Sequence, residues 1–331
     1  MDLVLRPMST SQVLDRTFYL YRNNFVLFAG IAIITPALKL VALLIQLKIF
    51  GPVVMPRQPE AISPQFLQAM FVRVIISFVV GVVIYLVGTA LASSATAYAV
   101  SMVHLGKTTT IAESYSRVKP IFLRIVWLLC GVVTFTFGPL LLSYVLILAL
   151  AFGIPLLVKS AGSQIGFAMA MLAGVLFLLA GIVGSLVWML YALCRYALAV
   201  TACTLERLPA RISLVRSKFL TYGAKWSILG IVILTGFMSV ILTYTLQLPA
   251  LLASNSLVMT TRTHLTMAAT VWIYFADFLG GALAGPVTTI ALALVYYDQR
   301  VRKEAFDLQL MMEAVGQSAP APPAAAAPSI G

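Results

Sequence analysis

The sequence predicts an all-α membrane protein, a polytopic bundle of six transmembrane helices. Three observations support this fold class: 61% of the 331 residues are hydrophobic, only 10% are charged, and long apolar runs recur along the whole chain. A water-soluble domain is about half apolar and about a quarter charged. The present composition leaves too little polar surface to cover a core in water. We therefore expect one transmembrane domain over residues 1–315.

Six apolar runs are long enough to cross a hydrocarbon layer of about 30 Å, which needs about 20 helical residues. They cover residues 25–50, 70–103, 121–158, 165–204, 226–253 and 267–297. Several are longer than the minimum and must tilt or kink. Helix breakers predict kinks at Pro36, Gly138-Pro139, Gly181 with Gly184, Gly280-Gly281 and Gly285-Pro286. The fourth run is predicted to be one kinked span, because no polar turn divides it; division at Gly181–Gly184 is the alternative.

Positive charge is distributed unequally between the two sides that six spans define. The side of the N-terminus carries Arg6, Arg16, Arg22, Lys107, Arg117, Lys119, Arg124, Arg195, Arg207, Arg211, Arg216, Lys218, Lys225, Arg300, Arg302 and Lys303. The opposite side carries only Lys48, Arg57, Arg73, Lys159 and Arg262. Since positive segments stay in the cytoplasm, both termini are predicted to be cytoplasmic.

The net charge of +12 is better explained by lipid than by nucleic acid. Anionic headgroups attract short basic segments beside membrane spans. A nucleic-acid platform would interleave basic residues with exposed aromatics, and no such stretch is present. Membrane lipids are therefore the expected partners, with an unidentified membrane or cytoplasmic protein as a further candidate.

Similar polar–apolar segments precede the three odd-numbered spans, at residues 13–30, 114–131 and 214–230. In each, an Arg is followed fourteen residues later by a Gly; the pairs are Arg16–Gly30, Arg117–Gly131 and Arg216–Gly230. This register predicts tandem repeats of about 100 residues, over 8–105, 106–205 and 206–315. Two spans return the chain to the same side, so the copies are expected to be parallel around a rough threefold axis.

Each repeat is predicted to be a short amphipathic elbow helix followed by a helical hairpin. Helices of this type lie in the membrane interface, where Arg and Lys reach lipid phosphates. The simpler interpretation is that the elbows only orient the spans, and the alternative is that Arg16, Arg117 and Arg216 contact headgroups. Residues 296–314 resemble a further elbow, and the uncharged Ala/Pro-rich residues 316–331 are expected to form a disordered tail.

Four segments carry a family resemblance. They are STSQVLDRTFYLYRNNF near the N-terminus, LGKTTTIAESYSRVKPIFLRIVWLL (105–129), TLERLPARISLVRSKFLTYGAKWSILG (204–230) and YYDQRVRKEAFDLQLMME (296–313). Together, over about residues 8–313, the chain resembles the bacterial glycerophosphoryl diester phosphodiesterase membrane domain-like family. That name comes from proteins in which such a region precedes a phosphodiesterase barrel. No soluble stretch here could form a barrel of about 250 residues, so the resemblance implies a protein of the bacterial cytoplasmic membrane without phosphodiesterase activity.

No catalytic, cofactor or metal site is predicted, and we expect the protein not to be an enzyme. Metal-dependent phosphodiester hydrolysis needs clustered acidic and His ligands. The only histidines, His104 and His264, fall on opposite sides of the predicted bilayer. HExxH, P-loop and GxSxG motifs are absent. Cys130, Cys194 and Cys203 lie in apolar runs and are expected to be small buried residues.

Three charged residues fall within predicted spans: Lys39, Arg195 and Asp277. Charge at bilayer depth is costly and marks a candidate functional site. Lys39 and Asp277 both fall in the outer half, where they could pair or line a water-filled pocket. The alternative is that Lys39 extends to the interface and Asp277 lies close to it. Arg195, in the inner half, is expected to extend toward cytoplasmic headgroups.

Two classes of function follow. The first interpretation is a non-enzymatic protein that anchors or organises something at the membrane through lipid or partner contacts. The second is a transporter or permeation domain for a small molecule or lipid; a membrane-embedded enzyme ranks below both because acid and base groups are sparse. A polar cavity containing Lys39 and Asp277 would favour transport, and a closed apolar bundle would favour anchoring.

Overall fold

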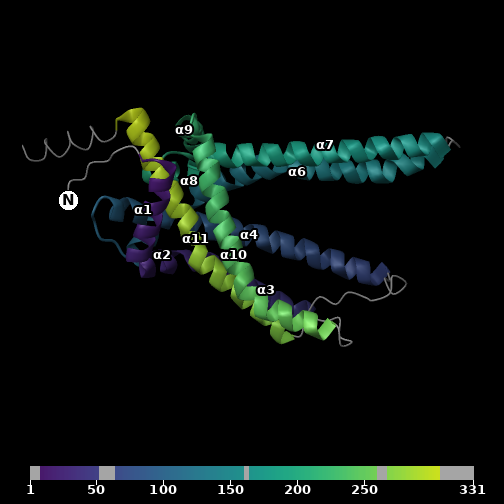
Figure 1. Cartoon of the computed structure of the whole chain (residues 1–331), viewed down its shortest axis with the longest axis horizontal. Helices are drawn as coiled ribbons and strands as arrows, with labels where there is room; N and C mark the ends of the chain where they lie inside the picture. Colours follow the sequence, from purple (N-terminus) through teal and green to yellow (C-terminus); the bar gives the residue numbers. More distant parts are fainter. Residues whose placement is uncertain (1–7, 52–63, 160–163, 259–266, 306–331) are drawn as a thin grey trace, which may run out of the picture.

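The computed structural model describes residues 8–51, 64–159, 164–258 and 267–305, and these form helices without any strand (Figure 1). The prediction of an all-α fold is confirmed for this part of the chain. The helices are α1 (Thr10–Asn23), α2 (Phe25–Ala32), α3 (Ile34–Phe50), α4 (Pro64–His104), α5 (Ile111–Val118), η2 (Lys119–Ile121), α6 (Phe122–Lys159), α7 (Gln164–Tyr196), α8 (Ala199–Leu205), α9 (Ala210–Thr221), α10 (Lys225–Val258) and α11 (Met267–Glu304).

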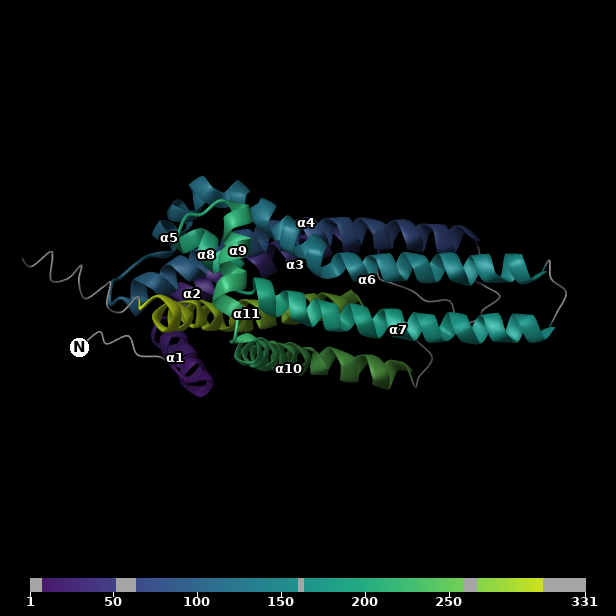
Figure 2. The same ribbon diagram turned by 90° about the horizontal axis from the view of Figure 1, so that it is seen from above.

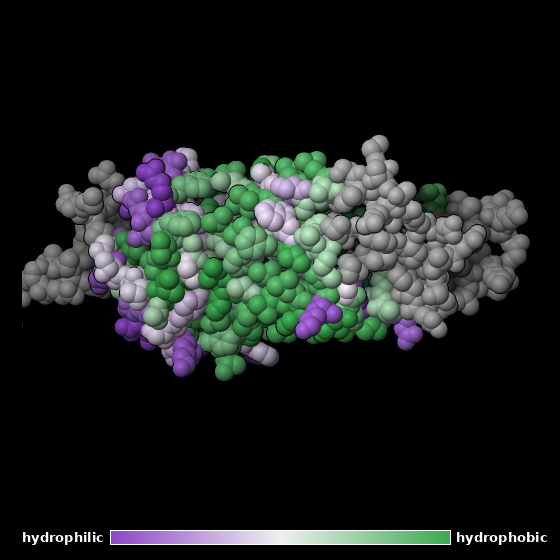
Figure 3. All heavy atoms as spheres, turned by 90° about the horizontal axis from the view of Figure 1, so that it is seen from below, coloured by the Kyte–Doolittle hydropathy of each residue, from purple (hydrophilic) through white to green (hydrophobic). Residues whose placement is uncertain are grey.

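The long helices are apolar enough to cross a membrane. Among the described residues, five helical stretches meet this requirement: Gln68–His104, Ile111–Leu146, Leu172–Leu205, Lys225–Ala253 and Met267–Glu304. The pair α2 and α3 forms a sixth if it is counted as one span bent by 40°. Hydrophobic side chains cover the middle of the molecule, and hydrophilic ones gather at one end (Figure 3). The apolar helices thus indicate a multi-pass membrane protein.

Some of the predicted helix breakers coincide with a bend in a helix, and others do not. The bend between α2 and α3 lies at Ile33, three residues before Pro36. Proline has no N–H to donate to the carbonyl four residues earlier, which weakens the helix at this point. In contrast, α7 is unbroken through Gly181 and Gly184. The fourth apolar run is therefore one helix up to Tyr196, and its division into two spans is excluded.

The short helices α1, α5, α8 and α9 lie together at one end of the bundle, here called the elbow end (Figures 1 and 2). Local sequence explains where two of them begin. The Ser9 hydroxyl accepts a hydrogen bond from the Gln12 N–H, and the Thr110 hydroxyl accepts one from the Glu113 N–H, at 3.2 Å. Such N-caps satisfy backbone donors that the first helical turn leaves free. The polar–apolar segments therefore do form the short helices that the sequence predicted.

The elbow helices bury one face against the protein, and not only against lipid as expected. In α1 the buried residues are Val13, Thr17 and Leu20, at helical spacing. In α9, Ser213, Ser217 and Leu220 are likewise buried. A second face of α9 remains available to a membrane, because this helix also exposes the hydrophobic residues Ile212, Val215 and Phe219.

Each of the three elbows α1, α5 and α9 precedes a pair of helices that pack along one another: α3 with α4, α6 with α7, and α10 with α11. The surroundings of the three repeat glycines differ, however. A Cβ at Gly30 would lie 2.5 Å from the Ile111 side chain, whereas those at Gly131 and Gly230 would meet open space. The Arg–Gly register therefore does not reflect one shared packing contact.

The segment 296–314 does not begin a separate elbow. Residues 296–304 continue α11 without a break, because the residues that join them to the apolar run lack a helix-ending signal. The rest of this segment and the predicted tail 316–331 lie outside the described residues.

Glycines bring four helices into close contact. An added Cβ at Gly88 of α4 would lie 2.7 Å from the Thr35 side chain of α3. At Gly281 of α11 it would lie 3.2 Å from Pro36, also of α3, and at Gly280 it would lie 3.1 Å from the Thr243 Cα of α10. Small residues allow such approach between membrane helices, where dispersion contacts replace the hydrophobic effect. These contacts hold α3, α4, α10 and α11 together.

We expect Gly280→Leu to lower the melting temperature of the detergent-purified protein. Its Cβ would collide with the backbone of Thr243, which cannot move aside as a side-chain end can, and such overpacking costs about 1–3 kcal/mol. Gly236→Leu in α10 is the matched control, because open space surrounds its Cβ. Equal melting temperatures for the two variants would contradict the close contact between α10 and α11.

Candidate membrane-embedded polar cavity

A cavity of about 780 Å³ lies among α3, α4 and α11, with Thr243 contributed by α10. Its lining is mostly apolar but carries polar side chains over its whole length. The polar lining residues are Thr35, Lys39, Gln46, Arg73, Ser77, Tyr85, Thr89, Ser93, Thr96, Thr243, Tyr274, Asp277 and Thr289.

Helix α4 supplies one continuous polar stripe to the cavity. Its members are Arg73, Ser77, Gly81, Tyr85, Thr89, Ser93 and Thr96. Residues spaced three or four apart share one face of a helix. From Arg73 to Thr96 this face extends about 35 Å at 1.5 Å per residue, close to the thickness of a hydrocarbon layer. The stripe therefore provides polar groups at nearly every depth of a membrane.

Lys39 of α3 and Asp277 of α11 face each other across this cavity. The Lys39 Nζ lies 2.7 Å from the Asp277 Oδ2. Lys39 is followed by about 17 Å of helix to the end of α3, and Asp277 is preceded by about 15 Å of α11. Both therefore lie about half a hydrocarbon thickness from the far end, the end of the bundle opposite the elbow end. At that depth an ion pair lowers the cost that either charge would carry alone.

The cavity is open along its middle and closed toward the elbow end. Side chains of Lys39 and Asp277 are 53% and 29% exposed, and Tyr85 is 50% exposed. Thr96, at the elbow-end limit of the stripe, is 1% exposed. The Thr35 hydroxyl oxygen is buried without a hydrogen-bond partner among the described residues. A polar ligand could therefore enter beside Lys39 but would meet packed side chains near Thr96.

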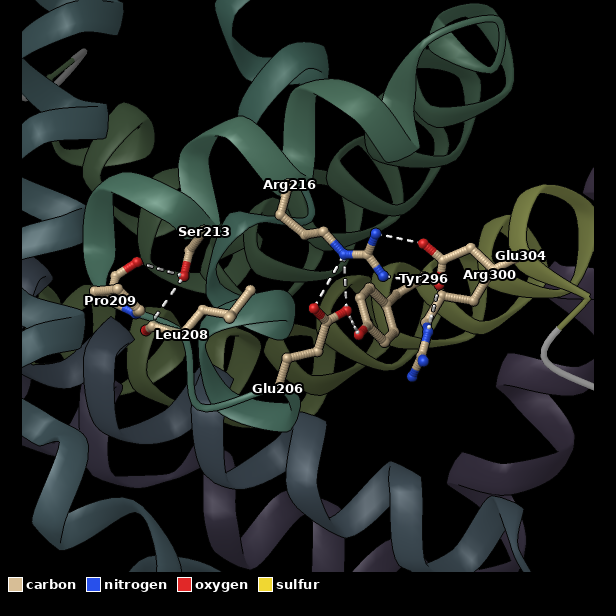
Figure 4. Close-up of polar contacts among 8 residues, drawn as sticks. All are labelled: Glu206, Leu208, Pro209, Ser213, Arg216, Tyr296, Arg300 and Glu304. Atoms are coloured by element: carbon tan, nitrogen blue, oxygen red, sulfur yellow. Dashed lines mark hydrogen bonds and ion pairs between the residues drawn. The ribbon is translucent and has the colours of Figure 1, made fainter. Parts of the chain in front are cut away.

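A second cluster of charged side chains connects α9 to α11 at the elbow end (Figure 4). The Arg216 Nε of α9 donates to both Glu206 carboxylate oxygens at 3.0 Å, and its Nη2 donates to the Glu304 Oε2 at 2.7 Å. The Tyr296 hydroxyl donates to Glu206, and Arg300 pairs with Glu304 at 3.1 Å. The bond to Glu304, with that to Glu206, raises the pKa of Arg216 above its ordinary value although burial opposes this. Arg216 therefore joins the α8–α9 connection to the end of α11.

The last turn of α11 makes two more attachments. The Lys303 Nζ donates to the carbonyls of Phe219, Leu220 and Tyr222, at 2.7, 2.9 and 2.6 Å. A cation at a helix C-terminus satisfies carbonyls that have no intrahelical partner. Arg302 bonds to Asp298 at 2.8 Å and to the Met8 carbonyl at 2.7 Å. The first described residue, Met8, is thus hydrogen-bonded to the last turn of α11 at the elbow end.

The remaining predicted residues have different surroundings. Arg16 and Arg117 are exposed on α1 and α5, with Arg16 over the Tyr19 ring at 5.2 Å. Arg195 is half-buried, and its guanidinium bonds to the Tyr191 hydroxyl and lies 5.5 Å from that ring. The three elbow arginines are therefore not equivalent, because only Arg216 is held by two carboxylates. Arg195 contacts Tyr191, one turn earlier on the same helix, and its expected contact with headgroups stays a prediction.

Sequence reasoning missed the α4 stripe and the partners of Arg216. The stripe has a readable signal, since Ser, Thr, Gly and Arg recur at four-residue spacing within the run 70–103. Among the described residues, no three His, Cys, Asp or Glu side chains are grouped as a metal site would require. The cysteines of this part of the chain are free, with Cys194 and Cys203 buried.

These features define a class: a multi-pass helical membrane protein with a polar cavity among its apolar helices. Comparison with protein-family models, curated proteins and solved structures gives no match to the chain. The resemblance to the glycerophosphoryl diester phosphodiesterase membrane domain-like family accordingly stays a prediction.

Proposed function

We propose that this protein is a transporter or permeation domain that takes an amphipathic, lipid-like molecule into the cavity among α3, α4 and α11. The observation that carries the proposal is the polar cavity containing the Lys39–Asp277 ion pair. A protein that only anchors others has no need of a polar path within apolar helices, where charged groups are rare and mark substrate pathways.

The mixed lining supports an amphipathic ligand. Apolar side chains such as Leu43, Val80 and Ile84 alternate with the polar stripe of α4. Hydrocarbon can lie against the former while a polar headgroup bonds to the latter. The described lining residues include one carboxylate, Asp277, which is paired with Lys39, and no His or Cys. This favours binding and movement of the ligand over a reaction on it.

We place the protein in the bacterial cytoplasmic membrane with six spans, the bent pair α2 and α3 counting as one. Both termini are cytoplasmic in this proposal, since Lys and Arg concentrate at the elbow end. The cavity then opens in the outer half of the bilayer. Three parallel hairpins, each preceded by an elbow helix, account for the order of the helices.

Anchoring or organising remains the second candidate function. Exposed Arg16 and Arg117 at the elbow end, with the exposed apolar face of α9, favour contacts with lipid headgroups or with a partner protein. This role needs no cavity, so filling the cavity separates the two candidates.

We expect Gly81→Leu to remove the ligand and leave the fold intact. Open space surrounds a Cβ at Gly81, and its side chain would extend into the cavity. Native mass spectrometry of protein released from lipid nanodiscs should show a lipid-like molecule that the wild type retains and Gly81→Leu loses. Gly184→Leu in α7 is the matched control, because it adds the same side chain in open space away from the cavity.

A wild-type protein that retains no such molecule would contradict the proposal. Retention by Gly81→Leu equal to that of Gly184→Leu would contradict it as well, since the bound molecule would then lie elsewhere. In either case the anchoring role becomes the better explanation.

A further inference from the structure

A positively charged side chain lies at the far end of the cavity. Arg73 of α4 lines it, and no described carboxylate lies within 4 Å of this guanidinium. Its one described contact is with the Phe50 ring, whose centroid lies 5.8 Å away. A guanidinium carries five donors and no acceptor. Among the described residues, Arg73 therefore has no carboxylate partner, and its positive charge lines the far end of the cavity.

The neighbouring polar groups add donors at the next helical turn. The Ser77 hydroxyl donates to the Gln46 Oε1 at 2.9 Å. That bond occupies the acceptor of the Gln46 amide and leaves its NH₂ without a described protein partner. Ser77 lies four residues after Arg73, and Gln46 lies four residues before Phe50. The Ser77–Gln46 pair is therefore about 6 Å along the helices from the Arg73–Phe50 pair. The far end of the cavity thus offers N–H donors and a positive charge.

The charges of the cavity as a whole have the same sign. Its described lining residues that are charged at neutral pH are Arg73, Lys39 and Asp277, and the last two neutralise each other. One positive charge therefore remains in a site that is partly shielded from water. Coulomb attraction is stronger there than in bulk water, and a ligand of opposite charge is favoured.

We propose that the amphipathic ligand is a lipid with an anionic headgroup, a phosphate or a carboxylate, which binds Arg73 and the Gln46 amide at the far end of the cavity. This inference rests on the proposed function and names its substrate class. The acyl part lies toward Val80 and Ile84, and the Lys39–Asp277 pair forms the next polar level toward the elbow end.

The test uses full-length protein in nanodiscs of equal parts phosphatidylglycerol, phosphatidylcholine and oleic acid, with native mass spectrometry of the retained lipid. Wild type should retain phosphatidylglycerol or oleate in preference to phosphatidylcholine, and which of the two dominates identifies phosphate or carboxylate. Arg73→Gln should reduce that preference about tenfold, as loss of one charge-assisted hydrogen bond implies. Lys48→Gln is the matched control, because Lys48 is an exposed cation near the same end of α3 that does not line the cavity.

Equal preference in Arg73→Gln and Lys48→Gln would overturn the anionic site. So would wild-type retention of phosphatidylcholine as strong as that of the anionic lipids, although the proposed function would then stand. Failure of the proposed function is a different result: wild type retains nothing, or Gly81→Leu retains as much as wild type.

Discussion

Asp277→Asn is expected to lower both the stability of the purified protein and its retention of a lipid-like ligand. The substitution leaves the Lys39 ammonium without its carboxylate, which now lies 2.7 Å away. An unpaired Lys near the middle of a membrane costs about 2.5–3.5 kcal/mol on insertion scales. The Lys39 side chain is 53% exposed and lines the cavity, so water in the cavity would reduce this cost. Thermal unfolding in nanodiscs measures the stability change.

The double variant Lys39→Gln/Asp277→Asn separates charge balance from ligand binding. It removes both charges, and we expect most of the lost stability to return because no uncompensated charge remains. A single Asp277→Asn variant that keeps wild-type melting temperature, membrane level and ligand retention would show that the pair has no role at this site.

Arg216→Met is expected to have the second large effect, a loss of stability of about 2 kcal/mol. Without the guanidinium, Arg300 is the one cation among the described residues that still forms an ion pair with Glu206 or Glu304. Both carboxylate side chains are 19% exposed, so water screens part of the repulsion. The contact between α9 and α11 at the elbow end should weaken, and a lower melting temperature in detergent would detect this.

Arg211→Met is the matched control for this result. Arg211 lies on the same helix and is exposed, and no described carboxylate lies within 4 Å of it. We expect the melting temperature of Arg211→Met to stay near that of the wild type. Arg216→Lys keeps the charge but loses the planar guanidinium, so its melting temperature should lie between those of Arg216→Met and the wild type. Equal effects of Arg211→Met and Arg216→Met would contradict a structural role for the ion network.

The fold was predictable because hydropathy depends on composition over long windows. A bend beside Pro36 was also predictable, since a missing N–H has a local consequence, although α6 and α11 continue through Pro139 and Pro286. The glycines at Gly181 and Gly184 gave no break, because glycine permits a bend without requiring one. Whether a helix bends there depends on neighbouring helices, which local sequence does not specify.

The site was predictable only where charge is unusual for its surroundings. Lys39 and Asp277 are conspicuous in apolar runs, and the structure brings them together. The α4 stripe is harder to detect, because Ser, Thr and Gly hardly change the hydropathy of a run. The pairing of Arg216 with Glu304 joins residues 88 positions apart. It depends on how the long helices pack, so the elbow sequence alone does not reveal it.

Cysteine accessibility along α4 tests most directly whether a polar cavity lies among the apolar helices. Single cysteines at Ser77, Gly81 and Thr89, and at exposed Val79 and Val83, would be introduced after Cys130, Cys194 and Cys203 are replaced by Ala. Our account predicts that a small charged thiol reagent modifies the first three in intact membranes and spares the two valine positions. Reaction at all five positions, or at none of the first three, would show that α4 presents no polar cavity to its surroundings.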